Sequence, residues 1–171
     1  MHIILQTPRL ILRQITLADA PLILELNSDP EVVKYLHEPT LKNVEHAEDV
    51  ITNIILPQYK NKLGRWAIHT KDNMDFIGWC GLKYRPETEE TDLGYRLVQN
   101  AWGRGFATEA AQHCLDHGFI VLGLKVITAC AHIENLASIQ VLEKIGMDFI
   151  GEGIVDHCPV RTYTKSNPAY R

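Results

Sequence analysis

The stretch LVQNAWGRGFATEAAQHCLDHGF (residues 97–119) joins a strand-like segment to a helix through a glycine-rich turn. After the turn, small residues recur at helical spacing from Ala107 to Gly118. Backbone N–H groups at the start of such a helix attract negative charge, and glycines let a ligand come close to the backbone. The pattern therefore indicates a strand–turn–helix unit suited to a phosphate or diphosphate.

Three kinds of phosphate site have glycines in such a turn. The nucleotide P-loop fails on spacing, because no Lys-Ser or Lys-Thr pair follows the glycines. The dinucleotide fingerprint G-x-G-x-x-G matches Gly103 and Gly105 but has Thr108 at its third glycine, and Lys125 stands near the expected acidic position. The third kind is the pyrophosphate loop of an acetyl-CoA enzyme. On the loop alone, a turn without any ligand remains an equal alternative.

The whole chain has the composition of an ordinary globular protein, with 171 residues, 46% hydrophobic and 22% charged. The net charge of −4 gives no electrostatic footprint for a nucleic acid. The four cysteines form no C-x-x-C pair, so we expect free thiols and no metal. We also expect no membrane segment, no signal peptide and a cytoplasmic location.

Hydrophobic periodicity predicts strands and helices in a mixed order. We expect early helices before most of the sheet, then a hairpin around residues 71–75, and Gly64 as the end of a long helix. The expected strands are 9–15, 65–70, 76–85, 89–98, 125–131, 148–155 and 160–165. The expected helices are 17–27, a second one starting in 28–36, 43–64, 105–121 and 135–146.

Four blocks of sequence then stand in one order: TPRLILRQITLADA (7–20), NSDPEVVKYL (27–36), DLGYRLVQNAWGRGFATEA (92–110) and HIENLASIQVLEKIGM (132–147). Together they resemble the GNAT superfamily of N-acetyltransferases, specifically the branch with the ribosomal-protein alanine N-acetyltransferases. The resemblance spans residues 7–155. It implies an α+β fold with a central, mostly antiparallel twisted sheet, splayed middle strands and helices on both faces, in a single acetyltransferase domain over 1–171.

The resemblance also implies where acetyl-CoA binds. Leu97 and Val98 would pair with the pantetheine arm from the splayed strand, and Trp102 would lead into the loop. Asn100 departs from the glutamine or arginine that the family often has there, which leaves the backbone cradle unaffected. The residues that would hold the pyrophosphate are Gly103, Arg104, Gly105, Phe106, Ala107 and Thr108.

Two residues of the late helix complete the implied coenzyme site. Asn135 suits an N-cap on its own, and in the family it also bonds the pantetheine. Ser138 matches a family position near the coenzyme sulfur, where a hydroxyl can protonate the departing thiolate. A purely structural serine is the alternative.

An amine nucleophile must also lose a proton, which requires a carboxylate or an ordered water. Asp92 matches the acidic residue that the family has before its Gly-Tyr pair, here Gly94-Tyr95, and Glu90 shares its strand face. Either carboxylate could instead attract a cationic amine, or Asp92 could be a structural acceptor. Trp66 and Trp79 are expected in the core or in a pocket wall.

The resemblance therefore implies acetyl-CoA-dependent N-acetylation of a primary amine by direct attack. The acceptor would be a protein N-terminus, ribosomal or other, or a small amine, and the protein would be a monomer or homodimer that binds neither nucleic acid nor membrane. Two alternatives remain open: a non-catalytic acyl-CoA-binding or sensing module, and a dinucleotide-binding protein.

Overall fold

The computed structural model describes residues 1–36 and 38–170. Its strands form one eight-stranded sheet in the order β1-β2-β3-β4-β5-β6-β8-β7. Every neighbouring pair is antiparallel except β5 and β6, which run parallel. The strands are β1 (Ile3–Gln6), β2 (Leu10–Gln14), β3 (Gly64–Thr70), β4 (Phe76–Arg85), β5 (Glu90–Leu97), β6 (Val126–His132), β7 (Asp148–Val155) and β8 (Cys158–Ser166).

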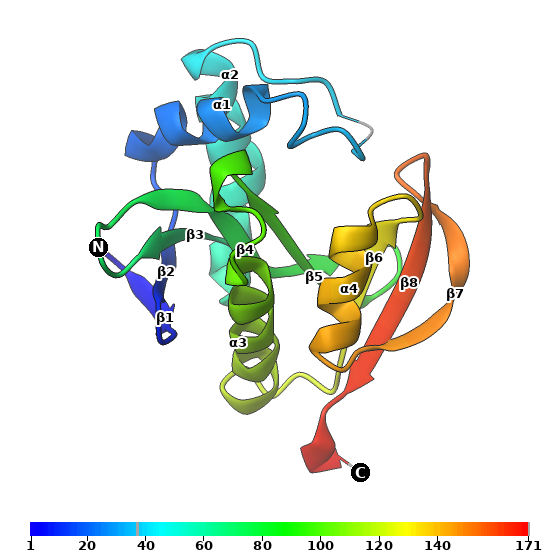
Figure 1. Ribbon diagram of the computed structural model, residues 1–171. Coiled ribbons are helices and arrows are strands. Elements are labelled where there is room, and N and C mark those ends of the chain that lie inside the picture. The colour runs from blue at the N-terminus through cyan, green and yellow to red at the C-terminus, as the bar shows by residue number, and fades with distance from the viewer. Residues whose placement is uncertain (37, 171) are drawn as a thin grey trace.

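The helices flank the sheet, as Figure 1 shows. They are α1 (Ala20–Ser28), which follows a short 3-10 turn, α2 (Val44–Val50), α3 (Phe106–Ile120) and α4 (Leu136–Lys144). The helix predicted over 43–64 is one helical run that changes pitch, because α2 continues through a π-turn (Ile51–Ile55) and a 3-10 segment (Leu56–Asn61). Lys62, with φ 60°, ends this run, whereas Gly64 opens β3, so the prediction that Gly64 stops the helix was wrong.

Two further differences concern short segments near the N-terminus. Residues 30–36 form turns and not the predicted second helix. Strand β1 was not predicted at all, because four residues at the sheet edge show too little alternation.

The two faces of the sheet carry separate cores. Along β3, Trp66 and Ile68 point into the core that α3 and α4 cover, whereas Ala67 points into the core that α1 and α2 cover. The predicted mixed fold, with a mostly antiparallel sheet and helices on both faces, is therefore confirmed.

The middle of the sheet opens between its two parallel strands. Strand β5 pairs with β6 at only one position, Asp92 with Thr128, and the Thr128 hydroxyl donates to the Thr91 carbonyl at 3.3 Å. By contrast, β5 is paired with β4 along its whole length, and β6 is paired in the same way with β8. The two half-sheets therefore meet at one point, and the predicted splayed middle strands are present.

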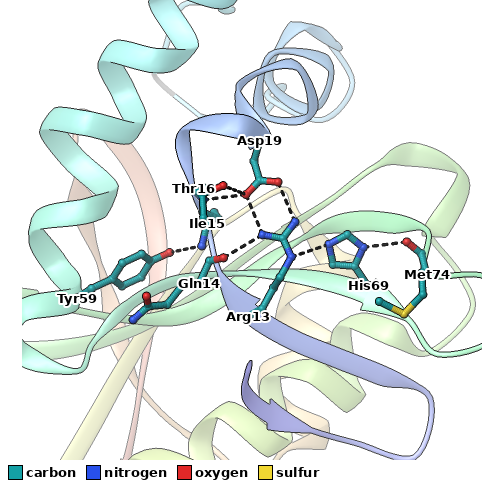
Figure 2. Close-up of polar contacts among 8 residues, drawn as sticks. All are labelled: Arg13, Gln14, Ile15, Thr16, Asp19, Tyr59, His69 and Met74. Carbon is teal, nitrogen blue, oxygen red and sulfur yellow. Dashed lines mark hydrogen bonds and ion pairs between the residues drawn. The ribbon is translucent and has the colours of Figure 1, made fainter. Parts of the chain in front are cut away.

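A buried polar network ties β2 to the helices on the α1 side (Figure 2). Arg13 donates two hydrogen bonds of 2.8 Å to the carboxylate of Asp19 and a third, of 3.1 Å, to His69. Nearby, Tyr59 accepts a hydrogen bond from the backbone of Ile15 and donates to the Arg65 carbonyl. Because both charges of the Arg13–Asp19 pair are largely buried, losing one would leave the other uncompensated.

The pKa of Asp19 makes this pair testable. Burial alone would raise the pKa, but hydrogen bonds from Arg13 and Thr16 outweigh it and hold the pKa below its ordinary value. A lowered folded-state pKa stabilises the protein above the unfolded value of about 3.9, and the stabilisation is lost as the pH falls through the folded pKa.

We therefore expect Asp19→Asn to lower the free energy of unfolding at pH 7 by roughly 2 kcal/mol. The difference from the parent should shrink as the pH falls below about 4. Urea unfolding at several pH values measures both effects, and Asp49→Asn on the exposed side of α2 is the matched control. Equal stability of the Asp19 variant and the parent at pH 7 would contradict this account.

Candidate active site

A cavity of about 1140 Å³ occupies the gap between the C-terminal halves of β5 and β6. The N-terminal ends of α3 and α4 border it, so two helix ends and an unpaired strand edge meet in one space. The structure brings most of the sequence-predicted site residues to this cavity. They are Asp92, Leu97, Trp102, Gly103, Gly105, Phe106, Ala107, Thr108, Asn135 and Ser138.

The loop before α3 has the geometry of an anion cradle. Gly103 and Gly105 have φ of 71° and 79°, a region that favours glycine, and a Cβ on Gly103 would meet no atom within 4 Å. The first backbone bond of the helix runs from the Glu109 N–H to the Gly105 carbonyl. The N–H groups of residues 103–108 donate to no backbone carbonyl of the described residues. These donors and the open space fit a diphosphate.

The loop is fixed in place from the side by Arg9 of the segment before β2. The Arg9 guanidinium donates to Glu109 at 2.7 Å and to the Arg104 carbonyl at 3.0 Å, and it stacks on the Phe106 ring at 4.4 Å. Arg104 does not line the cavity. Its guanidinium lies 4.7 Å from the centroid of the Phe106 ring, and the residue is exposed. Its charge is thus available only at the rim.

The last residues of β5 use part of their backbone within the protein. The Val98 N–H donates to the Ile77 carbonyl at 2.9 Å, the Val98 carbonyl accepts from Ala101 at 3.0 Å, and Val98 does not line the cavity. The Leu97 carbonyl accepts from the Trp102 indole at 3.0 Å. The strand edge that faces the gap therefore lies mainly before Val98, in residues 93–97.

A pair of hydroxyl groups, one from α4 and one from β5, lies at the cavity wall next to α4. Asn135 is the N-cap, as predicted, and its side chain accepts from the Ser138 N–H at 3.2 Å. The Ser138 hydroxyl lies 2.8 Å from the hydroxyl of Tyr95 on β5, and burial raises the pKa of Tyr95 to about 12. Sequence reasoning missed Tyr95 as a site residue, although it stands in the Gly-Tyr pair that carried the family resemblance.

Asp92 lies at the apex of the gap and on the opposite face from Tyr95. Residues of β5 alternate, so Asp92 shares its face with Arg96, which stacks on Trp79, whereas Leu93 and Tyr95 pack toward α3 and α4. Burial raises the pKa of Asp92 to about 6, although Arg85 at 3.4 Å opposes the shift. The carboxylate can therefore take up a proton near neutral pH.

The two tryptophans lie where the sequence reasoning placed them. Trp66 is fully buried in the α3-side core, and Trp79 lines the cavity on the other face.

One histidine pair has the spacing of a helical metal site. His113 and His117 stand four residues apart on α3, but His113 bonds the Glu109 carbonyl and His117 packs edge-on against Trp66. Among the described residues, no three His, Cys, Asp or Glu side chains lie together in a way that could hold a metal ion. Within the same residues, no helix has the length and apolar character to cross a membrane.

Comparison with known proteins places this architecture. Residues 9–148 match the family model described as the acetyltransferase (GNAT) domain. The uncharacterized N-acetyltransferase p20 of Bacillus licheniformis is 37% identical over 152 residues, which cover 88% of this chain and 84% of that protein.

Two solved structures share the fold at lower identity. RimL, described as a ribosomal L7/L12 α-N-protein acetyltransferase in complex with coenzyme A, superposes with a TM-score of 0.84 at 17% identity, covering 98% of this chain and 99% of RimL. The spermidine N-acetyltransferase of Vibrio cholerae, in complex with CoA and spermine, gives 0.79 at 19%, covering 94% and 97%. On the evidence of the family model and the relatives, this chain is an N-acetyltransferase and belongs to the GNAT family.

Proposed function

We propose that this protein transfers the acetyl group of acetyl-CoA to a primary amine by direct attack. The observation that carries the proposal is the set of free N–H donors at residues 103–108, which opens onto the gap between β5 and β6. GNAT acetyltransferases use acetyl-CoA as cosubstrate.

The chain's own groups can hold each part of the coenzyme. The N–H groups of residues 103–108 bind the pyrophosphate, and the exposed Arg104 adds a cation at the rim. The unpaired edge of β5 up to Leu97 and the amide of Asn135 face the gap and bond the pantetheine arm. Val98 supports this edge from behind through its bond to β4.

When bound, acetyl-CoA supplies a thioester whose acyl carbon forms a C–N bond with the amine while its C–S bond breaks. Ser138 donates its hydroxyl proton to the leaving sulfur, and Tyr95 donates its own proton to the Ser138 oxygen at 2.8 Å. Asp92, on the other face, accepts the amine proton through an intervening water. Proton removal and proton delivery are thus separated by the sheet.

The proposed acceptor is either a protein N-terminus or a small amine. RimL is described as an acetyltransferase of a protein N-terminus, and the Vibrio cholerae enzyme as one of spermidine. Both are less than 20% identical to this chain. The fold is therefore compatible with both.

A panel of amines tests the proposal. Purified protein is mixed with acetyl-CoA and either peptides of differing N-terminal residue or small amines, and free CoA release and the acetylated product are measured. Amine-dependent release with a matching N-acetyl product supports the enzyme. Saturable acetyl-CoA binding without release for any amine would favour the acyl-CoA-sensing alternative instead, and stabilisation by NAD but not by CoA would favour a dinucleotide site.

The cradle makes a prediction about Gly105. A valine there would be strained at φ 79° and would place its Cβ 3.3 Å from the Arg9 guanidinium. We expect Gly105→Val to weaken acetyl-CoA binding at least about tenfold, because the N–H groups can no longer surround the diphosphate. Isothermal titration measures the affinity. Gly151→Val, at φ 144° on β7 and away from the cavity, controls for backbone strain, and unchanged affinity in the Gly105 variant would remove the cradle assignment.

For the Ser138–Tyr95 hydroxyl pair we expect substitutions to lower the turnover number and leave acetyl-CoA affinity nearly unchanged. Ser138→Ala should lower kcat about 10–100-fold with little change in acetyl-CoA affinity, because the proton is needed mainly in the transition state. Tyr95→Phe should lower kcat less, since it leaves Ser138 as donor but removes its proton supply. Steady-state kinetics with a separate binding titration distinguish this from a binding role, in which Ser138→Ala would lose affinity and keep its turnover.

If Asp92 is the base, its protonation should change the slope of the pH–rate profile. The acceptor amine must be neutral, so log kcat/KM should rise by one unit per pH unit below the amine's own pKa. Below about pH 6, protonation of Asp92 should add a second unit of slope in the parent protein. Asp92→Asn should be slower and keep a slope of one throughout. A variant that retains the steeper slope would exclude Asp92 as the base.

A further inference from the structure

The face of the cavity toward α1 and α2 gathers basic side chains from three strands. Arg65 of β3, Lys83 and Arg85 of β4 and Arg96 of β5 all line it. The register explains the cluster, because Arg65 lies opposite Gly81, and Gly81 lies opposite Gly94. The two glycines contribute no side chains of their own, and the Trp79 ring lies against Gly94. We call this face of the cavity the basic floor.

Two of the four cations have carboxylate partners in the fold. Arg85 pairs with Asp92 at 3.4 Å and Asp156 at 3.7 Å. Arg96 pairs with Glu38 at 3.6 Å and donates to the Asn27 side chain. These contacts orient both guanidinium groups and offset their charge.

The other two, Arg65 and Lys83, have none among the described residues: no carboxylate of that part of the chain lies within 4.0 Å of either. The Arg65 guanidinium lies 4.8 Å from the centroid of the Trp79 ring, and the Arg96 guanidinium lies 5.5 Å from the same centroid. Burial lowers the pKa of Arg65 to about 10 and also lowers that of Lys83, and neighbouring cations add to both shifts.

The acidic groups of the cavity reach this pair only at longer range than an ion pair, and Glu38 acts on Arg65 in this way. Asp92 and Asp156 act on Lys83 in the same way. Glu31 and Glu134 are exposed residues of other elements, Glu38 is committed to Arg96, and Asp92 and Asp156 are committed to Arg85. Removing a cation from water without a paired counter-ion is costly, and here two half-buried cations line one face of the cavity. The arrangement is that of a site whose anion arrives with a ligand.

We propose that the acceptor is a primary amine that also carries a carboxylate, and that Arg65 and Lys83 bind that carboxylate. This inference rests on the proposed acetylation and names its substrate class. The contact with Trp79 positions the Arg65 guanidinium, whose paired N–H donors suit the two oxygens of a carboxylate. With the carboxylate on these cations, the amine of the same molecule is directed along the floor toward Asp92 and the gap. A polyamine, by contrast, would meet like charges on the same floor.

Matched pairs of amines test the proposal. L-alanine is compared with L-alaninamide, 4-aminobutyrate with butylamine, and a peptide with aspartate next to its N-terminal residue with the asparagine version; spermidine is added. Rates are expressed per neutral amine, because the members of a pair differ in amine pKa. We expect the carboxylate member of at least one pair to have a kcat/KM at least about tenfold higher, the usual effect of a charge-assisted contact. The pair that shows this preference indicates whether the acceptor is a free amino acid or an acidic peptide. Equal rates within every pair, or spermidine as the best acceptor, would overturn the proposal.

Substitutions locate the effect on the named residues. Arg65→Gln and Lys83→Gln should each raise KM for the carboxylate amine about tenfold, while KM for its neutral partner changes less than about threefold. Arg65→Lys should recover part of the loss. Lys71→Gln, an exposed charge in the β3–β4 turn outside the cavity, is the matched control. Equal losses for both members of a pair would show a structural role and contradict the proposal.

A binding readout separates this proposal from the acetylation itself. With CoA present, the N-acetylated form of the preferred carboxylate amine should bind more tightly than its amide, and the difference should vanish in Arg65→Gln. If no amine accelerates CoA release, the proposed acetylation fails, and the titration alone then decides the carboxylate site. Equal binding of acid and amide would refute the site whatever the outcome for turnover.

Discussion

The structure depends on one unusual contact, the single residue pair that joins β5 to β6. Strand β5 is held by eight paired positions with β4, and β6 by seven with β8, so each strand is anchored within its own half of the sheet. Beyond Asp92 and Thr128 the two strands separate and leave the backbone groups that face the gap without strand partners. Such groups need water or a ligand. The same separation makes room for the N-terminal ends of α3 and α4, which supply the donors around the cavity. The binding site is therefore a consequence of where the sheet stops pairing.

The sheet also divides the chemistry. Because side chains alternate along β5, Tyr95 faces α4 and Ser138, whereas Asp92 faces α1, α2 and the basic floor. A hydroxyl pair and a carboxylate of raised pKa thus lie on opposite sides of one gap. In the proposed reaction, acceptor and coenzyme would therefore reach the same point from different faces without competing for space. The Arg13–Asp19 network holds the start of the α1 segment against β2, on the same face of the sheet as the basic floor.

Much of the fold could be predicted from the sequence because its signals are local. Alternation placed most strands, small residues at helical spacing placed α3, and the capping asparagine placed the start of α4. Residues 30–36 were mistaken for a helix because Pro30 suits a first turn as well as a bend. The cradle glycines were recognisable because positive φ is largely a property of glycine itself. The Tyr95–Ser138 contact was not, since its partners lie 43 residues apart and only the tertiary fold brings them together.

The basic floor shows most clearly what composition cannot reveal. The chain carries a net charge of −4, which says nothing about a local excess of cations. Arg65, Lys83 and Arg96 stand far apart in the sequence, and each alone resembles a solvated surface residue. Only the register of β3, β4 and β5, with Gly81 and Gly94 facing each other, brings them around one space. In the proposed complex these cations would act on the amine as well as on the carboxylate, because nearby positive charge disfavours a protonated amine. A floor that holds the acidic end of an acceptor therefore also favours the neutral, nucleophilic form of its amine.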